Sequence, residues 1–515
     1  MTDVIELAGL TVAGVRQGLA EGRFSCEALT AACLARIARY NPIYNAVIFV
    51  NPEALADARA IDARIATGEA LGSLAGVPVV IKDPMDMVGF PTTGGWSQLY
   101  SGAGGVDLMP GSDSAVVARM RAAGAILLGK TNVPVLSASG THANNSWAGP
   151  TVNAAAPDFA PGASSAGTAS AVAAGMAVLG LAEETGGSIQ NPAGAQALVG
   201  IKPTHGLVPN TGVLPLSSQR DVVGPIARCV ADAALCLDVL AGFTMADPKT
   251  VAAVGRLPVG GYAAGLSTTA LAGRRVGLYG PGWRTAERGG ALAEETAGLY
   301  AQAQADIAAR GAVLVEDPFA GSGFADISVA GVGGMTYDRR GMESLPYDMQ
   351  KYLERLGPDA ALRSFAAFAA ATQAQDPFAP GGVLQYMAEM PAFQASLADP
   401  AAVPELREFV AAREAYLAVF DAVMERHGLD VLAFPQQRAP LPALHGEAQI
   451  RTTTVSEINI AGLPGVVVPA GYHADGSPFA LIWLGRRFSE ATLLALAYDY
   501  EQATQHRRVP VLRVA

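Results

Sequence analysis

The hydrophobic pattern of the first 130 residues alternates between helical and strand-like segments. Apolar residues recur at helical spacing after Ser25, and the pair Asn41-Pro42 follows them, so we predict a capped helix over 26–40. The same pattern predicts strands at 45–50, 77–81 and 125–128 and helices at 52–67 and 114–123. This alternation predicts a layered α/β fold.

A segment of small residues follows. Residues 167–175 combine helical spacing with alanine, glycine and serine on every side, so we predict a deeply buried helix. A predicted strand at 177–181 then leads into a Thr-Gly-Gly-Ser loop at 185–188. The stretch 151–182 is almost uncharged, but its Ser, Thr, Gly and Pro content is too high for a membrane span.

The pattern changes beyond residue 245. We predict a strand at 274–279 and a helix at 291–309, whereas residues 320–400 carry Gly, Met, Tyr and Phe in irregular helical pieces. The alternation returns with predicted strands at 431–435, 465–469 and 479–484. No repeat, low-complexity linker or run of charge marks a boundary, so we predict one large domain with a peripheral helical region.

Composition narrows the class of protein. Hydrophobic residues make up 50% of the 515 residues and charged residues 16%, which is enough apolar surface for a large core. The formal net charge of -11 argues against nucleic acid or an anionic membrane as a partner. The N-terminus has no basic segment before an apolar run, and the four cysteines form no CxxC motif. We therefore expect no signal peptide, no metal site and a cytoplasmic protein.

Ser188 is the candidate nucleophile. It follows two glycines, which let a backbone turn sharply and present successive N–H groups to one point. The backbone N–H groups of Thr185, Gly186, Gly187 and Ser188 are therefore candidate donors to the oxyanion of an acyl-transfer reaction. Taken alone, a Gly-Gly-Ser sequence is more often a flexible loop.

Lys82 is the candidate base. It ends the apolar run at 77–81. An isolated lysine has a pKa of about 10.4, so it accepts a proton only if it is held neutral. Desolvation beside an apolar strand favours the neutral form. In the alternative interpretation, Lys82 pairs with the adjacent Asp83 or is simply exposed after its strand.

The spacing of these residues resembles the amidase signature family of Ser-cisSer-Lys hydrolases. Residues 76–83 match the family's lysine strand, and Ser164 lies 24 residues before Ser188, which is the spacing of the family's two serines. The resemblance implies that Ser164 relays a proton between Ser188 and Lys82 and that its peptide bond is cis. Ser165 is the alternative candidate for this role, but the 24-residue spacing disfavours it.

Further segments extend the resemblance along most of the chain: 113–132, 200–206, 221–225, 459–464 and 468–471. Lys130, in the first of them, is interpreted as structural. The resemblance implies a single amidase domain over 1–515 whose central twisted mixed β-sheet is covered on both faces by helices. It implies a catalytic core at about 70–245 and 430–515 and a helical, substrate-facing region at about 320–400.

The chain departs from the family pattern around the site. The departures are Ala163 and Ala166 in place of glycines, Val135 where Glu is frequent, Glu183-Glu184 where many members have Thr-Asp, and Gln190 where most have Arg. If the family's Asp and Arg pair, their joint replacement indicates altered contacts behind the site. None of these changes removes a proton-transfer group, so we expect an effect on substrate preference rather than on the reaction.

The resemblance implies hydrolysis of a carboxylic amide C–N bond through a serine acyl-enzyme, without a metal or organic cofactor. Carbamates and esters are alternative substrates, because one oxyanion hole serves all acyl centres. A glutamine-dependent amidotransferase subunit with a partner chain is the alternative from another class, and a non-catalytic binding protein is a third. The expected partner is a small-molecule amide or carbamate, and the expected state is a monomer or homodimer.

Methionine and aromatic residues of the 320–400 region are candidates for the substrate pocket: Met335, Tyr337, Tyr347, Met349, Tyr352, Phe365, Phe368 and Tyr386. Each fits an ordinary core equally well. Apolar walls would suit a hydrophobic or aryl amide, an anilide or a carbamate.

Overall fold

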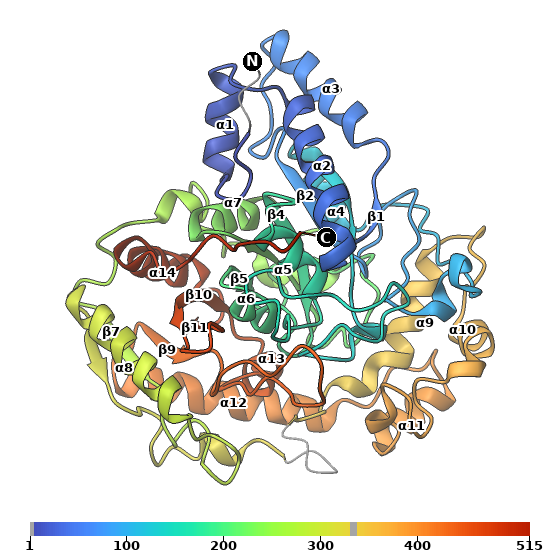
Figure 1. The fold of residues 1–515 in the computed structure, drawn as a ribbon. Coiled ribbons are helices and arrows are strands. Elements are labelled where there is room, and N and C mark those ends of the chain that lie inside the picture. The colour runs from blue at the N-terminus through green and yellow to red at the C-terminus, as the bar shows by residue number, and fades with distance from the viewer. Residues whose placement is uncertain (1–4, 330–336, 515) are drawn as a thin grey trace.

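The computed structural model describes residues 5–329 and 337–514 as one large α/β domain built around a mixed sheet (Figure 1). The order across the sheet is β1-β3-β2-β4-β6-β5-β10-β11-β9-β7-β8. The strands are β1 (Val47–Val50), β2 (Pro78–Lys82), β3 (Ile126–Thr131), β4 (Leu179–Glu184), β5 (Val199–Lys202), β6 (Val222–Ala227), β7 (Arg275–Leu278), β8 (Val313–Val315), β9 (Val431–Pro435), β10 (Gly465–Tyr472) and β11 (Pro478–Leu484). The predicted α/β class and mixed sheet are confirmed.

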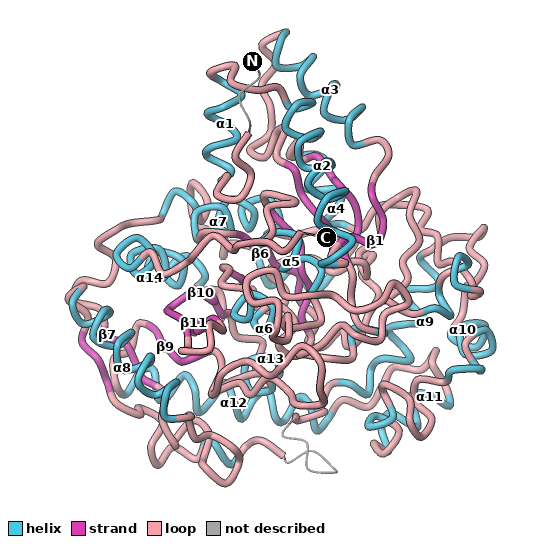
Figure 2. Tube along the Cα trace, in the orientation of Figure 1, coloured by secondary structure: helices cyan, strands magenta, loops and turns pink. Residues whose placement is uncertain are grey.

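Helices lie around most of the strands in the middle of the molecule, whereas β7 lies near its edge (Figure 2). They are α1 (Val12–Ala20), α2 (Cys26–Tyr44), α3 (Ala54–Ala66), α4 (Ala115–Ala122), α5 (Ala166–Ala173), α6 (Gln190–Ala195), α7 (Val230–Leu240), α8 (Glu294–Ala309), α9 (Leu345–Arg355), α10 (Phe365–Ala371), α11 (Pro391–Ala398), α12 (Arg407–Arg426), α13 (Ser456–Ala461) and α14 (Glu490–Thr504). Helix α5 packs on β2, β3 and β4, α6 on β5, β10 and β11, and α7 on β5 and β6.

Helix α5 lies at the centre of the fold, and every one of its residues is buried, as its small side chains predict. Its close approach to the sheet depends on Gly180 in β4, because a Cβ atom there would lie 2.4 Å from Cγ2 of Thr168. Within residues 5–329 and 337–514, no helix is long and apolar enough to cross a membrane. Most residues of the uncharged stretch 151–182 are buried, but only Ala166–Ala173 form a helix.

Several element boundaries differ from prediction, and two of them affect the candidate site or its surroundings. Helix α2 does not stop at Asn41-Pro42 but continues to Tyr44, because Pro42 stands in the last turn, where few backbone hydrogen bonds remain to lose. Asn45 ends the helix in the left-handed conformation, with φ 44°. Strand β4 ends at Glu184, later than predicted, because its two glutamates continue the antiparallel ladder with β6. This strand therefore carries two buried carboxyl groups to its end.

The 320–400 region forms a separate, mostly helical part of the fold around α9, α10 and α11, at the lower right of Figure 1. Its apolar side chains make a second core cluster that includes Met349, Tyr352, Phe365 and Phe368. These four pocket candidates are thus core residues. Met335 lies outside the described residues.

Candidate active site

Two neighbouring parallel strands bring the candidate residues together. Strands β2 and β4 run parallel, with Ile81 opposite Leu181, so their carboxyl ends meet at one edge of the sheet. Lys82 is the last residue of β2. The loop that carries Ser188 follows β4, and α5 begins directly after Ser164 and Ser165.

Lys82 is completely buried and donates hydrogen bonds to two residues. Its Nζ atom lies 2.8 Å from Oγ of Ser164. The same atom lies 3.0 Å from the carbonyl oxygen of Glu183 and 2.6 Å from Oε2 of the Glu183 carboxylate. Reasoning from the sequence missed Glu183 as a partner. Its signal was a glutamate in a segment that is otherwise uncharged and apolar.

The alternative interpretation of Lys82, as exposed or paired with Asp83, is wrong. Asp83 is also buried, but it has different partners from Lys82. It accepts hydrogen bonds from the backbone N–H and the hydroxyl group of Thr93. Its carboxylate lies 3.5 Å from Nζ of Lys130. Burial lowers the pKa of Lys130, and the charge of Asp83 opposes that shift. Successive residues of a strand point to opposite faces, which separates Asp83 from the Lys82 amine.

The two serines before α5 have different contacts. The Ala163–Ser164 peptide bond is cis, as the resemblance implies. Ser164 accepts the hydrogen bond from Lys82, whereas the hydroxyl of Ser165 donates to the carbonyl of Glu183 at 3.3 Å. The backbone N–H of Ser165 donates to the carbonyl of Ser188 at 3.3 Å. The structure therefore places Ser164 against the lysine and joins this segment to the segment of Ser188.

The loop before Ser188 turns on its two glycines. Gly187 has a φ of 93°, a conformation that side chains with a Cβ atom disfavour. Ser188 is buried except for 5% of its surface, and α6 begins two residues later. Within residues 5–329 and 337–514, the backbone N–H groups of Gly186, Gly187 and Ser188 make no hydrogen bond. The same holds for the backbone N–H group of Thr185, whose side chain contacts Glu183 and Asp221. In the described part of the chain, all four N–H groups are thus available as oxyanion donors.

The carboxylate of Glu184 forms hydrogen bonds with the start of α6. It accepts hydrogen bonds from the backbone N–H groups of Ile189 and Gln190 and from the side chain of Asn459. The amide of Gln190 also donates to it, at 2.5 Å. The two residues that replace the family's Asp and Arg are thus direct partners. Their contacts fix the segment that follows Ser188.

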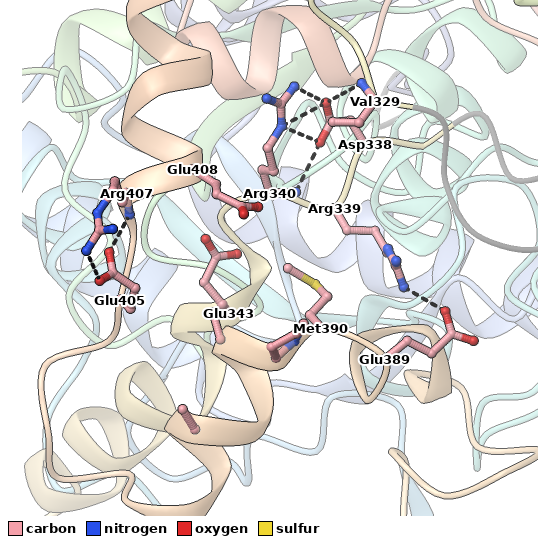
Figure 3. Close-up of a pocket in the computed structure, with 13 residues that line it drawn as sticks. Val329, Asp338, Arg339, Arg340, Glu343, Glu389, Met390, Glu405, Arg407 and Glu408 are labelled. Carbon is pink, nitrogen blue, oxygen red and sulfur yellow. Dashed lines mark hydrogen bonds and ion pairs between the residues drawn. The ribbon is translucent and has the colours of Figure 1, made fainter.

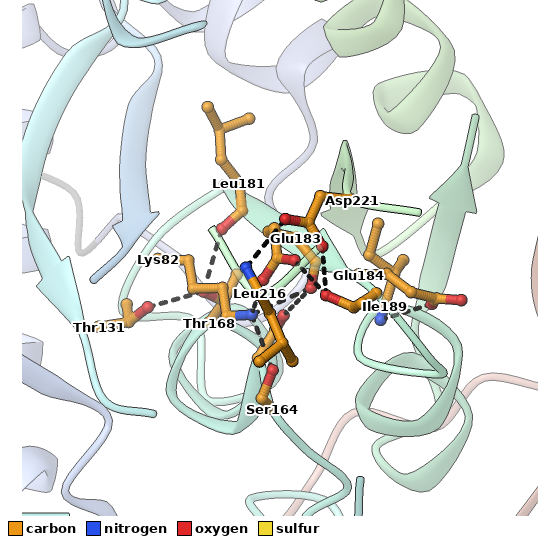
Figure 4. A network of polar contacts seen from close by, with 12 residues as sticks. Lys82, Thr131, Ser164, Thr168, Leu181, Glu183, Glu184, Ile189, Leu216 and Asp221 are labelled. Carbon is orange, nitrogen blue, oxygen red and sulfur yellow. Dashed lines mark hydrogen bonds and ion pairs between the residues drawn. The ribbon is translucent and has the colours of Figure 1, made fainter. Parts of the chain in front are cut away.

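Thr185 connects Glu183 to a second buried carboxyl group. Its hydroxyl lies 3.1 Å from Oε1 of Glu183 and 2.5 Å from Oδ1 of Asp221. The other oxygen of Asp221 accepts from the backbone N–H groups of Leu216 and Ser217. Burial, followed by the charge of Glu183, raises the pKa of Asp221 to about 8. Figure 4 shows this network beside Lys82 and Ser164.

Of the pocket candidates, Tyr337 lies against the candidate oxyanion loop. A Cβ atom at Gly186 would lie 2.5 Å from the Tyr337 hydroxyl. Arg220 donates to that hydroxyl at 3.0 Å and stacks on the ring at 5.3 Å. Tyr352 instead donates to Asp86.

A cavity of about 600 Å³ lies between the 338–343 segment, α11 and the start of α12 (Figure 3). Charged side chains line it, and several of them pair with each other: Arg339 with Glu389, Arg340 with Asp338, and Arg407 with Glu405. Within the described part of the chain, its lining does not include Lys82 or the two candidate serines. Nor does that part of the chain contain a group of three or more His, Cys, Asp or Glu side chains suited to a metal ion.

Comparison with known proteins agrees with this geometry. The family model described as Amidase matches residues 28–494. The chain is 31% identical to a glutamyl-tRNA(Gln) amidotransferase subunit of Moorella thermoacetica, over 99% of this chain and 100% of that protein. It is 34% identical to the corresponding subunit of Synechococcus sp. (strain WH7803), over 96% and 97%. Among solved structures, native peptide amidase from Stenotrophomonas maltophilia is similar with a TM-score of 0.81 and 33% identity, over 98% and 99%.

Proposed function

Because this chain belongs to the amidase family, known by its amidase signature, we propose that it hydrolyses a carboxylic amide through a serine acyl-enzyme. The observation that carries the proposal is the 2.8 Å hydrogen bond between Nζ of Lys82 and Oγ of Ser164 in the interior. A buried amine in contact with a serine hydroxyl is the arrangement that a Ser-Ser-Lys proton relay requires.

In this proposal Ser188 is the nucleophile, Ser164 the relay and Lys82 the base. Neutral Lys82 takes the proton of Ser164, which takes the proton of Ser188 as the Ser188 Oγ atom bonds to the acyl carbon. The free N–H groups at 186–188 bind the resulting oxyanion. The C–N bond then breaks, and the departing amine receives a proton from Lys82 through Ser164. Water hydrolyses the acyl-enzyme by the same route and releases the acid.

The substrate in this proposal is a small-molecule hydrophobic or aryl amide or an anilide. Tyr337 beside Gly186 supports an aromatic wall next to the reacting acyl group. The likeness to a peptide amidase adds peptide amides as a related class. Carbamates and esters remain alternatives, because the oxyanion donors contact the acyl oxygen and not the leaving group.

The test is amine release from a panel of aryl amides, anilides, peptide amides, carbamates, esters and glutamine, with wild type and Ser188→Ala compared. Release by the wild type that disappears in a folded Ser188→Ala variant supports the proposal. The best substrate of the panel then defines the class. Equal release by the two proteins would overturn it.

The second candidate function is that of an amidotransferase subunit. It is favoured by the curated relatives, which are amidotransferase subunits matched over nearly their whole length. Gln190, where most members have arginine, argues against it. The test is to put this chain in place of the corresponding subunit of a reconstituted glutamyl-tRNA(Gln) amidotransferase. Restored glutamine-dependent amide transfer would favour this candidate, whereas amide hydrolysis by the chain alone and no transfer would exclude it.

A further inference from the structure

A carboxylate faces the candidate base in the protein interior. Oε2 of Glu183 lies 2.6 Å from Nζ of Lys82, and the two side chains are 3% and 0% exposed. The other acceptors around Nζ are Oγ of Ser164 and the carbonyl of Glu183. The three protons of a lysine ammonium group thus meet three acceptors (Figure 4). This full set of contacts fixes the position of Nζ.

The other oxygen of Glu183 leads, through Thr185, to Asp221. A threonine hydroxyl carries one proton and cannot donate to two carboxylates at once. Its contacts with Glu183 and Asp221 are both full hydrogen bonds when one of the two carboxyl groups carries a proton. Burial raises the pKa of Asp221 to about 8, which assigns that proton to Asp221 at neutral pH. Asp221 then donates to Thr185, and Thr185 donates to the Glu183 carboxylate that faces Lys82.

We propose that Glu183 is a positioning residue for the base: its carboxylate holds Nζ of Lys82 against Ser164 and stabilises the ammonium group formed when Lys82 takes up a proton. Asp221, acting through Thr185, holds the carboxylate in this orientation. The inference rests on the proposed serine hydrolase function. An adjacent negative charge favours the ammonium form of an amine. The charge at residue 183 should therefore affect the pH dependence of the reaction at Ser188.

The charges around Glu183 come from few elements. Lys82 faces it from β2, and Asp221 faces it from the segment before β6. Tyr337 and Arg220 lie beyond Asp221. Glu184, the next residue of the strand, points to the opposite face and contacts Gln190 and Asn459. Lys82 is therefore the cation in direct contact with the side chain of residue 183.

The experiment measures the rate at which phenylmethylsulfonyl fluoride modifies Ser188 as a function of pH, which requires no knowledge of the substrate. Glu183→Gln keeps the size and the hydrogen bonds of the side chain but removes its charge. We expect the midpoint of the acidic limb to fall by about 1–3 pH units, with a slower rate at the plateau. Glu183→Thr, which restores the residue type common in the family, should shift the midpoint in the same direction. Glu184→Gln is the matched control and should leave the midpoint unchanged.

An unchanged midpoint in a folded Glu183→Gln or Glu183→Thr variant would overturn the inference, even with a lower rate. A purely structural role would reduce the rate equally at every pH. If neither variant folds while Glu184→Gln does, the role of Glu183 is structural and the inference fails. Lack of modification at Ser188 in the wild type would instead contradict the serine hydrolase proposal, so the two failures are distinguishable.

Discussion

The amine of Lys82 lies 2.6 Å from the carboxylate of Glu183, and both side chains are buried. In an interior of low polarity such a pair is strongly coupled, and a change in one charge alters the other. The 2.8 Å hydrogen bond from the same amine to Ser164 connects this ion pair to the candidate relay serine. In the proposed mechanism, proton transfer at the serines therefore depends on Glu183 as well as on Lys82.

Ser164 and Ser165 offer a matched pair of substitutions. Ser164→Ala removes the hydroxyl that contacts Lys82, and we expect kcat/KM to fall by about 10⁴-fold or more, because the proton relay is interrupted. Ser165→Ala removes only a hydrogen bond to the Glu183 carbonyl and should reduce kcat/KM by about 10-fold or less. Hydrolysis of the best panel substrate measures both. Equal losses in the two variants would contradict the assignment of Ser164 as the relay.

Glu184→Ala should destabilise the protein by about 3 kcal/mol, because it leaves the N–H groups of Ile189 and Gln190 buried without an acceptor. Urea unfolding followed by circular dichroism measures this. Glu425, an exposed residue of α12, provides the control, and Glu425→Ala should change stability by no more than about 0.5 kcal/mol. If Glu184→Ala and Glu425→Ala unfold at similar urea concentrations, Glu184 does not stabilise the start of α6.

Gly186→Ala should impair turnover rather than folding. The added methyl group would lie 2.5 Å from the Tyr337 hydroxyl, so either the tyrosine or the loop must move. We expect kcat to fall about 10-fold or more, because the N–H groups at 186–188 lose their alignment. The double variant Gly186→Ala/Tyr337→Ala removes the clash and should recover part of kcat.

Gly298→Ala is the control for this substitution, since a Cβ atom at this position of α8 meets no atom within 4 Å. It should leave kcat unchanged and add about 0.5–1 kcal/mol of helix stability. A Gly186→Ala variant with the kcat of Gly298→Ala would contradict an oxyanion hole in the 185–188 loop.

The sequence predicted the α/β class and most strands, because these follow from apolar periodicity. The grouping of Lys82 with Ser164 was implied by the resemblance to the amidase signature family. The sequence did not predict the contact between Lys82 and Glu183. The predicted strand ended at residue 181, since two consecutive glutamates contradict a buried strand by composition. In the structure, ladder pairing with β6 and hydrogen bonds to both carboxylates allow their burial.

The 320–400 region shows a different limit of the sequence. Tyr337 and Tyr352 carry the same local signal, an aromatic residue among irregular helices. Tyr337 contacts the candidate oxyanion loop, whereas Tyr352 lies in the second core cluster. The difference arises from how this region packs on the sheet, and that packing depends on contacts between residues far apart in sequence.

The proton on Asp221 should make stability depend on pH. The carboxyl group has a pKa of about 8 in the folded protein and about 3.9 in the unfolded chain. Between these values the folded protein retains a proton that the unfolded chain releases, so the free energy of unfolding falls as pH rises from about 4 to about 8. Below pH 4 and above pH 8 this contribution no longer changes. Asp221→Asn cannot titrate, and its amide can still donate to Thr185 and accept from the backbone.

We therefore expect Asp221→Asn to lose less stability than the wild type between pH 5 and about 8, measured by urea unfolding at each pH. Other buried carboxyl groups, such as Asp232 with a pKa of about 6, contribute equally to both proteins and cancel in the difference. Asp232→Asn is the control. The difference between its free energy of unfolding and that of the wild type should change with pH only up to about pH 6. If the free energy of unfolding changes with pH in the same way for Asp221→Asn and the wild type, Asp221 is already ionised at pH 5. Thr185 could then not donate to both carboxylates, and the proton chain behind Lys82 would be absent.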